Sequence, residues 1–517
     1  MGARVADLWP AYACSTSIEA LVFRYDWRMT SGAQFREAIC RDPSDMASRL
    51  VYSDWLMEQD NPLGEFIANH CRLEEMSGLE EGYSVLLAAT NRLEAKHAAT
   101  WLEEYLKRVK ASERFSRVAV DTLFNPEFRH GFLHRIAGQL EDVEAHWSWL
   151  REREPVQGME LLVGEGIGQE HRSLAVASGW RSLKVSPDGW FTANSVGDVL
   201  RWGFPELLEL DLSGCSLGVD GCRLLANLPT DLPDVFDDWT APPPLPEAQL
   251  KTLVLSRCAI GDEGAEILFA ANTLRALEEL DLSQCKLELV STLERMKGAA
   301  GLGQLRRLSI AGNKALGGQL GALAGWDVLP RLEAFALPLS ATEIDLAALF
   351  PTPSTCLREL NLSSAKELLK TPRVVTDAAT NFTALNIGSS RIGDTLWTEL
   401  LLAPSMSKVV DLRANGCSLS DKGVAALVSS GLDRLVRLDL SSNKLTDASL
   451  ALLAEWQGLA CVTHLRIGNN RKVTATGYQA LIESPYFAPT HLDIGKAEDE
   501  TLLAALRERF ETALYVG

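Results

Sequence analysis

The stretch from Leu435 to Leu445 reads LVRLDLSSNKL, a frame of the form L-x-x-L-x-L-x-x-N-x-L. Within it, apolar and polar residues alternate as they do in a half-buried strand. Four further copies stand at Leu207–Leu217, Leu250–Ile260, Leu277–Leu287 and Val409–Leu419. A frame that recurs along a chain predicts one structural unit stacked many times around a continuous core.

The spacing of the copies indicates what each unit contains. Most steps between successive strands are about 27 residues, which leaves room for a helix after each strand. The first apolar residues of the expected strands are Val156, Trp180, Leu207, Leu250, Leu277, Leu305, Leu332, Leu357, Phe382, Val409, Leu435, Val462 and Pro489. This pattern resembles leucine-rich repeats of the ribonuclease-inhibitor type. The resemblance implies an α/β fold: a horseshoe solenoid with parallel strands on its concave face and helices on its convex face.

Two kinds of side chain in the repeats are expected to be structural. At the position of Asn443, four copies have a cysteine that we expect to bond carbonyls of the turn after the strand, so that the four stack as a ladder of thiols. These cysteines are Cys215, Cys258, Cys285 and Cys417. Three aspartates, Asp262, Asp421 and Asp447, stand where they would cap the helix of their own repeat.

The N-terminal third has a different pattern. We expect a disordered leader over 1–28, an all-helical domain over 29–150, and a solenoid of about 13 repeats with a C-terminal capping helix over 151–517. The segments FREAI (Phe35–Ile39), RLVYSDWL (Arg49–Leu56) and GEFI (Gly64–Ile67) resemble the bacterial repeat-companion domain. That resemblance implies a domain that precedes repeat arrays, and it implies no activity.

The bulk composition narrows the class of partner. The net charge of −19 disfavours a surface that binds nucleic acid. No apolar run is long enough to span a membrane, and the N-terminus lacks the pattern of a secretory signal. Ten cysteines in so long a chain do not suggest a disulfide framework. We therefore expect a cytoplasmic protein whose partner is a protein or peptide, with no nucleic acid and no membrane.

One step between strands is longer than the rest because of an insertion over 229–249, which is rich in proline and aspartate. Such a composition predicts a protruding loop. In one interpretation the loop has no function. In the other, Phe236 and Trp239 anchor a partner.

The outward-facing strand residues are expected to form columns across the concave face. In the early repeats they bring together an acidic patch, made of Glu209, Asp211, Glu279 and Asp281. In the late repeats they bring together a mixed patch, made of Arg413, Arg437, Arg466, His464, His491, Asp411 and Asp439. The mixed patch departs from the LDLS motif that many repeats share and is the more informative candidate for binding.

Two histidine pairs are candidate metal ligands. His464 and His491 should be neighbours on adjacent strands, and His130 and His134 are four residues apart. Neither pair has an evident full ligand set, so we predict no metal and no cofactor. A pH-sensitive contact is the favoured interpretation of the first pair.

These observations favour a non-enzymatic scaffold with no catalytic residue. Two alternatives stay open. One is a regulator of an enzyme, such as a GTPase activator or a ubiquitin-ligase-like protein. A reactive thiol at Cys14, Cys40 or Cys71 would favour an enzyme with a catalytic cysteine. The other is a purely structural spacer.

Overall fold

The computed structural model describes residues 31–103, 107, 127–138, 148–163, 179–187, 193–200, 204–228, 245, 249–288, 290–313, 319–338, 341–496, 499–510 and 514–515. The leader over 1–28 and the loop residues Phe236 and Trp239 lie outside these ranges, so the expectations about them stay predictions. Both ends of the insertion are described, and the side chain of Asn227 bonds the backbone N–H and carbonyl of Leu245 at 3.0 and 3.2 Å.

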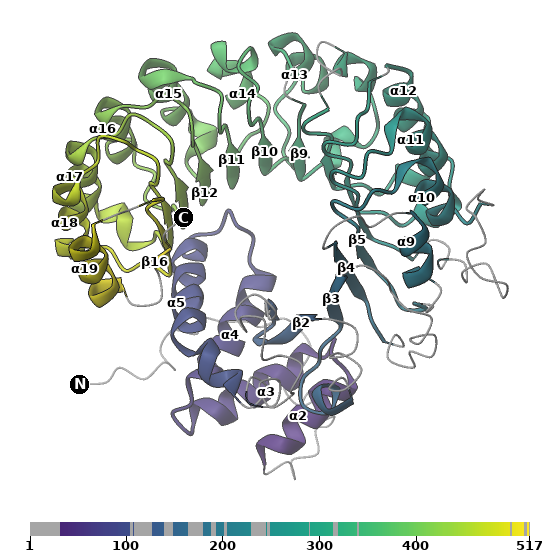
Figure 1. Ribbon diagram of the computed structural model, residues 1–517, viewed down its shortest axis with the longest axis horizontal. Coiled ribbons are helices and arrows are strands. Elements are labelled where there is room, and N and C mark those ends of the chain that lie inside the picture. Colours follow the sequence, from purple (N-terminus) through teal and green to yellow (C-terminus); the bar gives the residue numbers. More distant parts are fainter. Residues whose placement is uncertain are drawn as a thin grey trace, which may run out of the picture.

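A single sheet runs through the described residues, with each strand paired to the next in sequence (Figure 1). Its strands are β1 (Glu127–Arg129), β2 (Phe132–Gly138), β3 (Gly158–Val163), β4 (Ser182–Pro187), β5 (Glu209–Asp211), β6 (Thr252–Val254), β7 (Glu279–Asp281), β8 (Arg307–Ser309), β9 (Ala334–Ala336), β10 (Glu359–Asn361), β11 (Ala384–Asn386), β12 (Asp411–Arg413), β13 (Arg437–Asp439), β14 (His464–Arg466), β15 (His491–Asp493) and β16 (Leu514–Tyr515). Every predicted strand is present, and each of β3 to β15 begins two residues after its predicted first apolar residue.

Helices cover the outer side of this sheet (Figure 1). They are α9 (Ala193–Leu200), α10 (Gly218–Leu225), α11 (Gly261–Phe269), α12 (Val290–Gly298), α13 (Glu343–Leu349), α14 (Pro372–Thr376), α15 (Gly393–Leu401), α16 (Asp421–Val428), α17 (Asp447–Glu455), α18 (Ala475–Glu483) and α19 (Glu500–Phe510). The predicted α/β solenoid, with parallel strands inside and helices outside, is confirmed. No helix among the described residues combines the length and the apolar character that crossing a bilayer would take.

The N-terminal region holds the helices α2 (Gly32–Arg41), α3 (Met46–Met57), α4 (Pro62–Glu75) and α5 (Tyr83–Trp101). The stretch to residue 150 is not wholly helical, however, because β1 and β2 fall within it. His130 and Gly131, at φ 51° and 78°, make the turn between these two antiparallel strands. β2 then pairs with β3 in parallel, which satisfies its backbone groups and starts the sheet before the first predicted repeat.

Buried side chains at the strand exits join neighbouring repeats. The thiols of Cys258, Cys285 and Cys417 donate to carbonyls of the preceding repeat at 3.0, 2.9 and 3.2 Å, which confirms the predicted bonding for these three. The expectation of one stack of four thiols is wrong, since other residues occupy the same position between Cys285 and Cys417. These include Asn313, Ala365 and Ser390.

The aspartates expected as helix caps bond the next repeat instead. Asp421 accepts from the backbone N–H and hydroxyl of Thr446 at 3.0 and 2.8 Å, and Asp447 accepts from the same groups of Thr474 at 2.7 Å each. Asp262 accepts from the Thr292 hydroxyl at 2.6 Å. The prediction was wrong because each aspartate lies inside its helix, past the cap, where its side chain faces the neighbouring unit.

The helical region closes the horseshoe into a ring (Figure 1). The guanidinium of Arg434 donates to the carbonyls of Gly78, Leu79 and Glu80, at 3.1, 3.2 and 2.6 Å, in the loop before α5. On α5, Arg92 donates to the carbonyl of Ala488 at 3.1 Å. Since the solenoid residues involved precede their strands, these contacts lie along the edge where strands begin.

We expect Asn443→Ala to lower the free energy of unfolding by roughly 3 kcal/mol, because buried backbone groups would lose their partners. Its amide donates to the carbonyls of Ala414 and Leu440, at 2.8 and 3.0 Å, and its oxygen accepts from the N–H of Leu419. Cys285→Ala removes one such bond, so about 1 kcal/mol is expected. Urea unfolding measures both values, and equal losses would contradict the difference.

Replacing Arg92 and Arg434 together with alanine should open the ring, because these side chains hold the helical region to the late repeats. Small-angle scattering would then give a larger radius of gyration than for wild type. Arg373→Ala, on the outer helix α14, is the matched control. Superimposable curves for the double variant and wild type would show that these contacts do not hold the ring.

Candidate binding site on the concave face

The register of the sheet fixes two columns of side chains on the concave face. One runs Glu209, Thr252, Glu279, Arg307, Ala334, Glu359, Ala384, Asp411, Arg437, His464 and His491. The other runs Asp211, Val254, Asp281, Ser309, Ala336, Asn361, Asn386, Arg413, Asp439, Arg466 and Asp493. The expected columns of outward-facing strand residues are confirmed.

Carboxylates of the second column shape the turn after their own strands. Asp211, Asp281 and Asp439 each accept from the backbone N–H two residues further on, at 2.9, 2.7 and 2.9 Å. Short polar side chains favour such turns. The LDLS motif therefore has a local structural cause, and it does not by itself indicate a binding surface.

Neighbouring arginines offset part of the charge of the early acidic residues. Glu209 lies 3.5 Å from Arg135 and 3.7 Å from Arg129, so its charge is shared with two cations of the first strands. Thr252 stands between Glu209 and Glu279 in the column. Glu279 itself lies 3.6 Å from Arg307.

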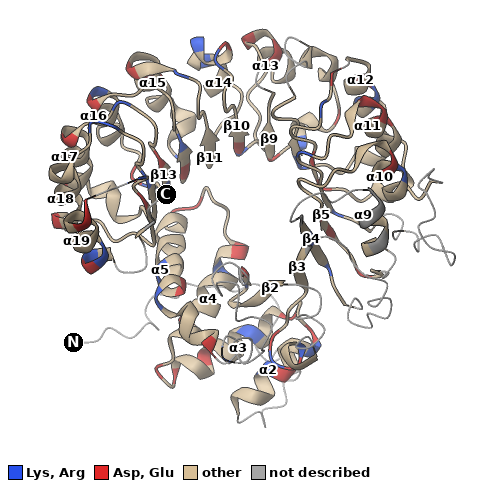
Figure 2. Ribbon diagram, viewed as in Figure 1, with Lys and Arg blue, Asp and Glu red and all other residues tan. Residues whose placement is uncertain are grey.

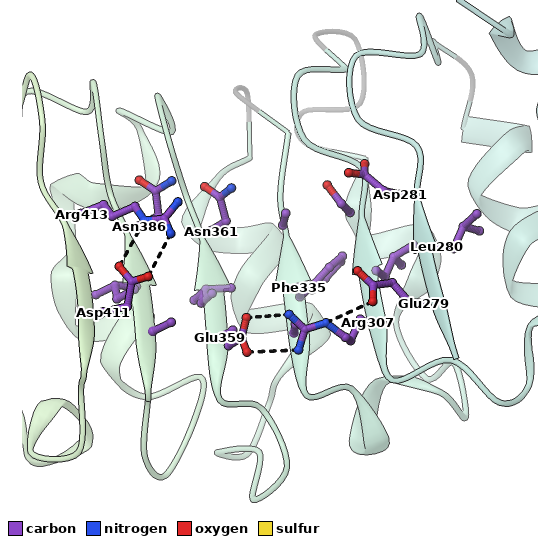
Figure 3. A pocket seen from close by; sticks show the side chains of 17 residues that line it. Glu279, Leu280, Asp281, Arg307, Phe335, Glu359, Asn361, Asn386, Asp411 and Arg413 are labelled. Carbon is purple, nitrogen blue, oxygen red and sulfur yellow. Dashed lines mark hydrogen bonds and ion pairs between the residues drawn. The ribbon is translucent and has the colours of Figure 1, made fainter. Parts of the chain in front are cut away.

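A hollow of about 280 Å³ lies in the middle of the concave face (Figure 3). Small side chains at Ala334, Ala336 and Ala384 leave this space open between larger polar neighbours. Across Ala334, the guanidinium of Arg307 makes two parallel bonds to the carboxylate of Glu359, at 3.1 and 2.8 Å. Burial raises the pKa of the Glu279 carboxyl, and Arg307 opposes that rise.

The late patch begins at the far end of this hollow (Figure 3). Asp411 is buried and binds Arg413 through two hydrogen bonds of 3.1 and 2.9 Å, while Arg437 lies 3.8 Å away. On the next strands, Arg466 lies 3.7 Å from Asp493. The three arginine side chains, Arg413, Arg437 and Arg466, are 52%, 46% and 53% exposed.

The histidine pair of the late patch is stacked. The rings of His464 and His491 lie 5.8 Å apart, nearly parallel. Burial first, and then the charge of Arg437, lowers the pKa of His464 to about 4. The imidazole of His464 therefore stays neutral near pH 7 and does not act there as a pH-sensitive contact. Among the described residues, no group of three or more His, Cys, Asp or Glu side chains could hold a metal ion.

Some residues of the hollow were not among the predicted site residues. Glu279, Asp281, Asp411 and Arg413 line it as predicted members of the two patches. Arg307, Glu359, Asn361 and Asn386 line it as well and were not singled out. The signal that could have found them is the three alanines of the two columns, Ala334, Ala336 and Ala384, since small residues between larger polar ones leave an indentation. Acidic and basic residues are otherwise interspersed around the ring (Figure 2).

Comparisons with known proteins agree with this architecture. Residues 206–226, 249–268 and 435–454 match the family model for leucine-rich repeats. With the solenoid, these matches identify a leucine-rich repeat protein. No curated protein matches the chain.

Two solved structures illustrate the likeness. A crystal structure of the Rad7 and Elc1 complex in yeast has 18% identity and a TM-score of 0.39 over 52% of this chain and 75% of that one. An internalin from Listeria monocytogenes has 16% identity and a TM-score of 0.30 over 65% of this chain and 90% of that one. Likenesses of this size carry no information about a partner.

His464→Gln should weaken the dependence of stability on pH. Because the folded pKa of about 4 lies below the unfolded value of about 6.5, the contribution of this group is fully present above pH 6.5 and is lost as the pH falls toward 4. Urea unfolding at several pH values in this window should therefore give a shallower slope for the variant. Equal slopes for wild type and variant would contradict the lowered pKa.

Proposed function

We propose that the protein is a non-enzymatic scaffold that binds a protein partner through its concave face. The observation that carries the proposal is the set of three half-exposed arginines on the adjacent strands β12 to β14, Arg413, Arg437 and Arg466. Their partners Asp411 and Asp493 occupy only part of each guanidinium fork. The remaining donors suit carboxylates of a partner.

Closure of the ring limits how a partner reaches these arginines. α5 and the loop before it occupy the strand-start edge of the late repeats, through Arg434 and Arg92. A partner must therefore enter an enclosed opening. An extended acidic segment or a protruding acidic loop fits this requirement better than a flat surface.

The cysteines weighed as nucleophiles support the non-enzymatic interpretation. Burial is the main cause that raises the pKa of Cys40 to about 12 and of Cys71 to about 11, so neither thiol is a ready thiolate at neutral pH. Cys14 lies outside the described residues. The described cysteines are free thiols, which favours a reducing compartment such as the cytoplasm.

For the N-terminal region, we propose a bacterial repeat-companion domain over 29–150, ahead of the solenoid over 151–517. The apolar residues of its sequence segments support this, since they pack together as a small core. That core contains Phe35, Ile39, Tyr52, Leu56 and Ile67.

Affinity capture from a lysate of the native cells tests the proposed surface. We expect a protein that is retained by wild type to be lost when Arg413, Arg437 and Arg466 are all changed to glutamate, because the donors for its carboxylates become repelling charges. Thermal unfolding of the variant checks that it is folded.

A variant with Arg295, Arg373 and Lys422 changed to glutamate is the matched control. These residues belong to the outer helices α12, α14 and α16, and the change in charge is the same. The control should retain the partner. Equal retention by all three proteins would show that the concave arginines do not bind the partner. The structural spacer or partner binding through the 229–249 loop would then be the remaining interpretations.

A further inference from the structure

A second cavity, of about 210 Å³, lies where the helical region meets the first strands of the sheet. The turn before α3 forms one wall, the β1–β2 turn another, and the starts of β3 to β5 a third. Three arginines line it, Arg49, Arg129 and Arg181, together with His134. Glu209 is the one carboxylate among the described residues that line it.

Arg49 is the unusual member of this cavity. It is 3% exposed, and one of its terminal nitrogens donates to the carbonyl of Pro43. In the described part of the chain, no carboxylate lies within ion-pair distance of its guanidinium, and its Nε has no acceptor. The guanidinium also lies over the Phe132 ring, 5.5 Å from its centroid. Since a buried charge without a paired anion is costly, a chain that retains one points to an anion that completes the site.

Neighbouring acids do not supply that anion. Asp42 accepts from the N–H and hydroxyl of Ser44 at 3.1 and 2.6 Å, within its own turn. Asp45 caps α3 by accepting from the N–H groups of Ala47 and Ser48, at 3.0 and 3.3 Å. Both carboxylates moderate the positive charge of Arg49, and they also accept hydrogen bonds from backbone and serine hydroxyl groups close to them in the chain.

The other two arginines are held loosely. Arg129 lies 3.7 Å from Glu209, and Arg181 lies 3.5 Å from Glu206. Their side chains are 47% and 42% exposed, so each can turn toward a ligand in the cavity. Glu209 is moreover shared with Arg135, at 3.5 Å, which leaves an excess of cations around the space.

The environment of His134 is consistent with this excess of cations. It is buried in β2, and its pKa is lowered to about 3, by burial first and then by the charges of Arg129 and Arg135. The ring of His134 is therefore neutral at physiological pH, while the arginines keep their charge. An anion of matching size would relieve the repulsion among these cations.

We propose that this cavity binds a phosphate group, with the guanidinium of Arg49 at its base and those of Arg129 and Arg181 at its mouth. Guanidinium forks match the oxygen spacing of a phosphate and bind it through paired hydrogen bonds. The volume accommodates inorganic phosphate or the phosphate of a small monoester. The site is distinct from the concave arginines and does not depend on the proposed protein partner.

Calorimetric titration of the full chain with sodium phosphate, against sodium chloride at equal ionic strength, tests the proposal. We expect saturable binding to wild type and at least ~10-fold weaker binding to Arg49→Gln and to Arg129→Gln, because each loses charge-assisted hydrogen bonds. Arg373→Gln, on the outer helix α14, should bind like wild type. If Arg49→Gln fails to fold, Arg129→Gln and Arg181→Gln decide, since their side chains are partly exposed.

A parallel titration with glycerol 2-phosphate distinguishes the two sources of the group. Tighter binding of the monoester assigns the cavity to a phosphorylated small molecule, and tighter binding of inorganic phosphate assigns it to the free anion. The absence of saturable binding of either compound to wild type would overturn the proposal. Unchanged binding by folded Arg49→Gln, Arg129→Gln and Arg181→Gln would overturn it as well.

Discussion

Hydrogen bonds from buried side chains at the exits of several strands to backbone carbonyls of the adjoining turns are the interaction on which this solenoid depends. A strand of three residues cannot satisfy the turn that follows it, so Asn443, Cys285 and their equivalents supply the missing partners inside the core. Aspartates at the outer helices repeat the principle, since Asp421 and Asp447 each tie one repeat to the next. Stacking is thus enforced on both sides of the core, and the concave columns follow from it.

The strands and the columns could be predicted from the sequence because both follow from the repeat length and from the alternation of apolar and polar residues. It could not predict the role of Asp421, since an aspartate beside a helix start fits its own helix and the next repeat equally well. Ring closure could not be predicted for a different reason. The contact between Arg434 and Gly78 joins residues far apart in the chain, and no periodic pattern in the sequence indicates it. The hollow depends on which small residues become neighbours, and Ala334 and Ala384 become informative only beside Arg307 and Glu359.

The ring gives the molecule two separate chemical environments. On the concave face, arginines share carboxylates and keep part of their donors exposed, which suits an acidic protein segment. At the junction of the helical region and the sheet, Arg49 is buried without a carboxylate among the described residues, which suits a small anion. A chain of net charge −19 therefore still offers cations to an anionic ligand at two places.

Closure of the ring is the central claim, and a disulfide tests it most directly. An ideal Cβ at Gly78 would lie 3.7 Å from the Cβ of Thr383, close to the mean separation in disulfides. The double variant Gly78→Cys and Thr383→Cys should form this bond under mild oxidation, detected by mass spectrometry of the peptides, and the two single variants should not. If both introduced thiols stay reduced and open to alkylation, the helical region does not close the horseshoe.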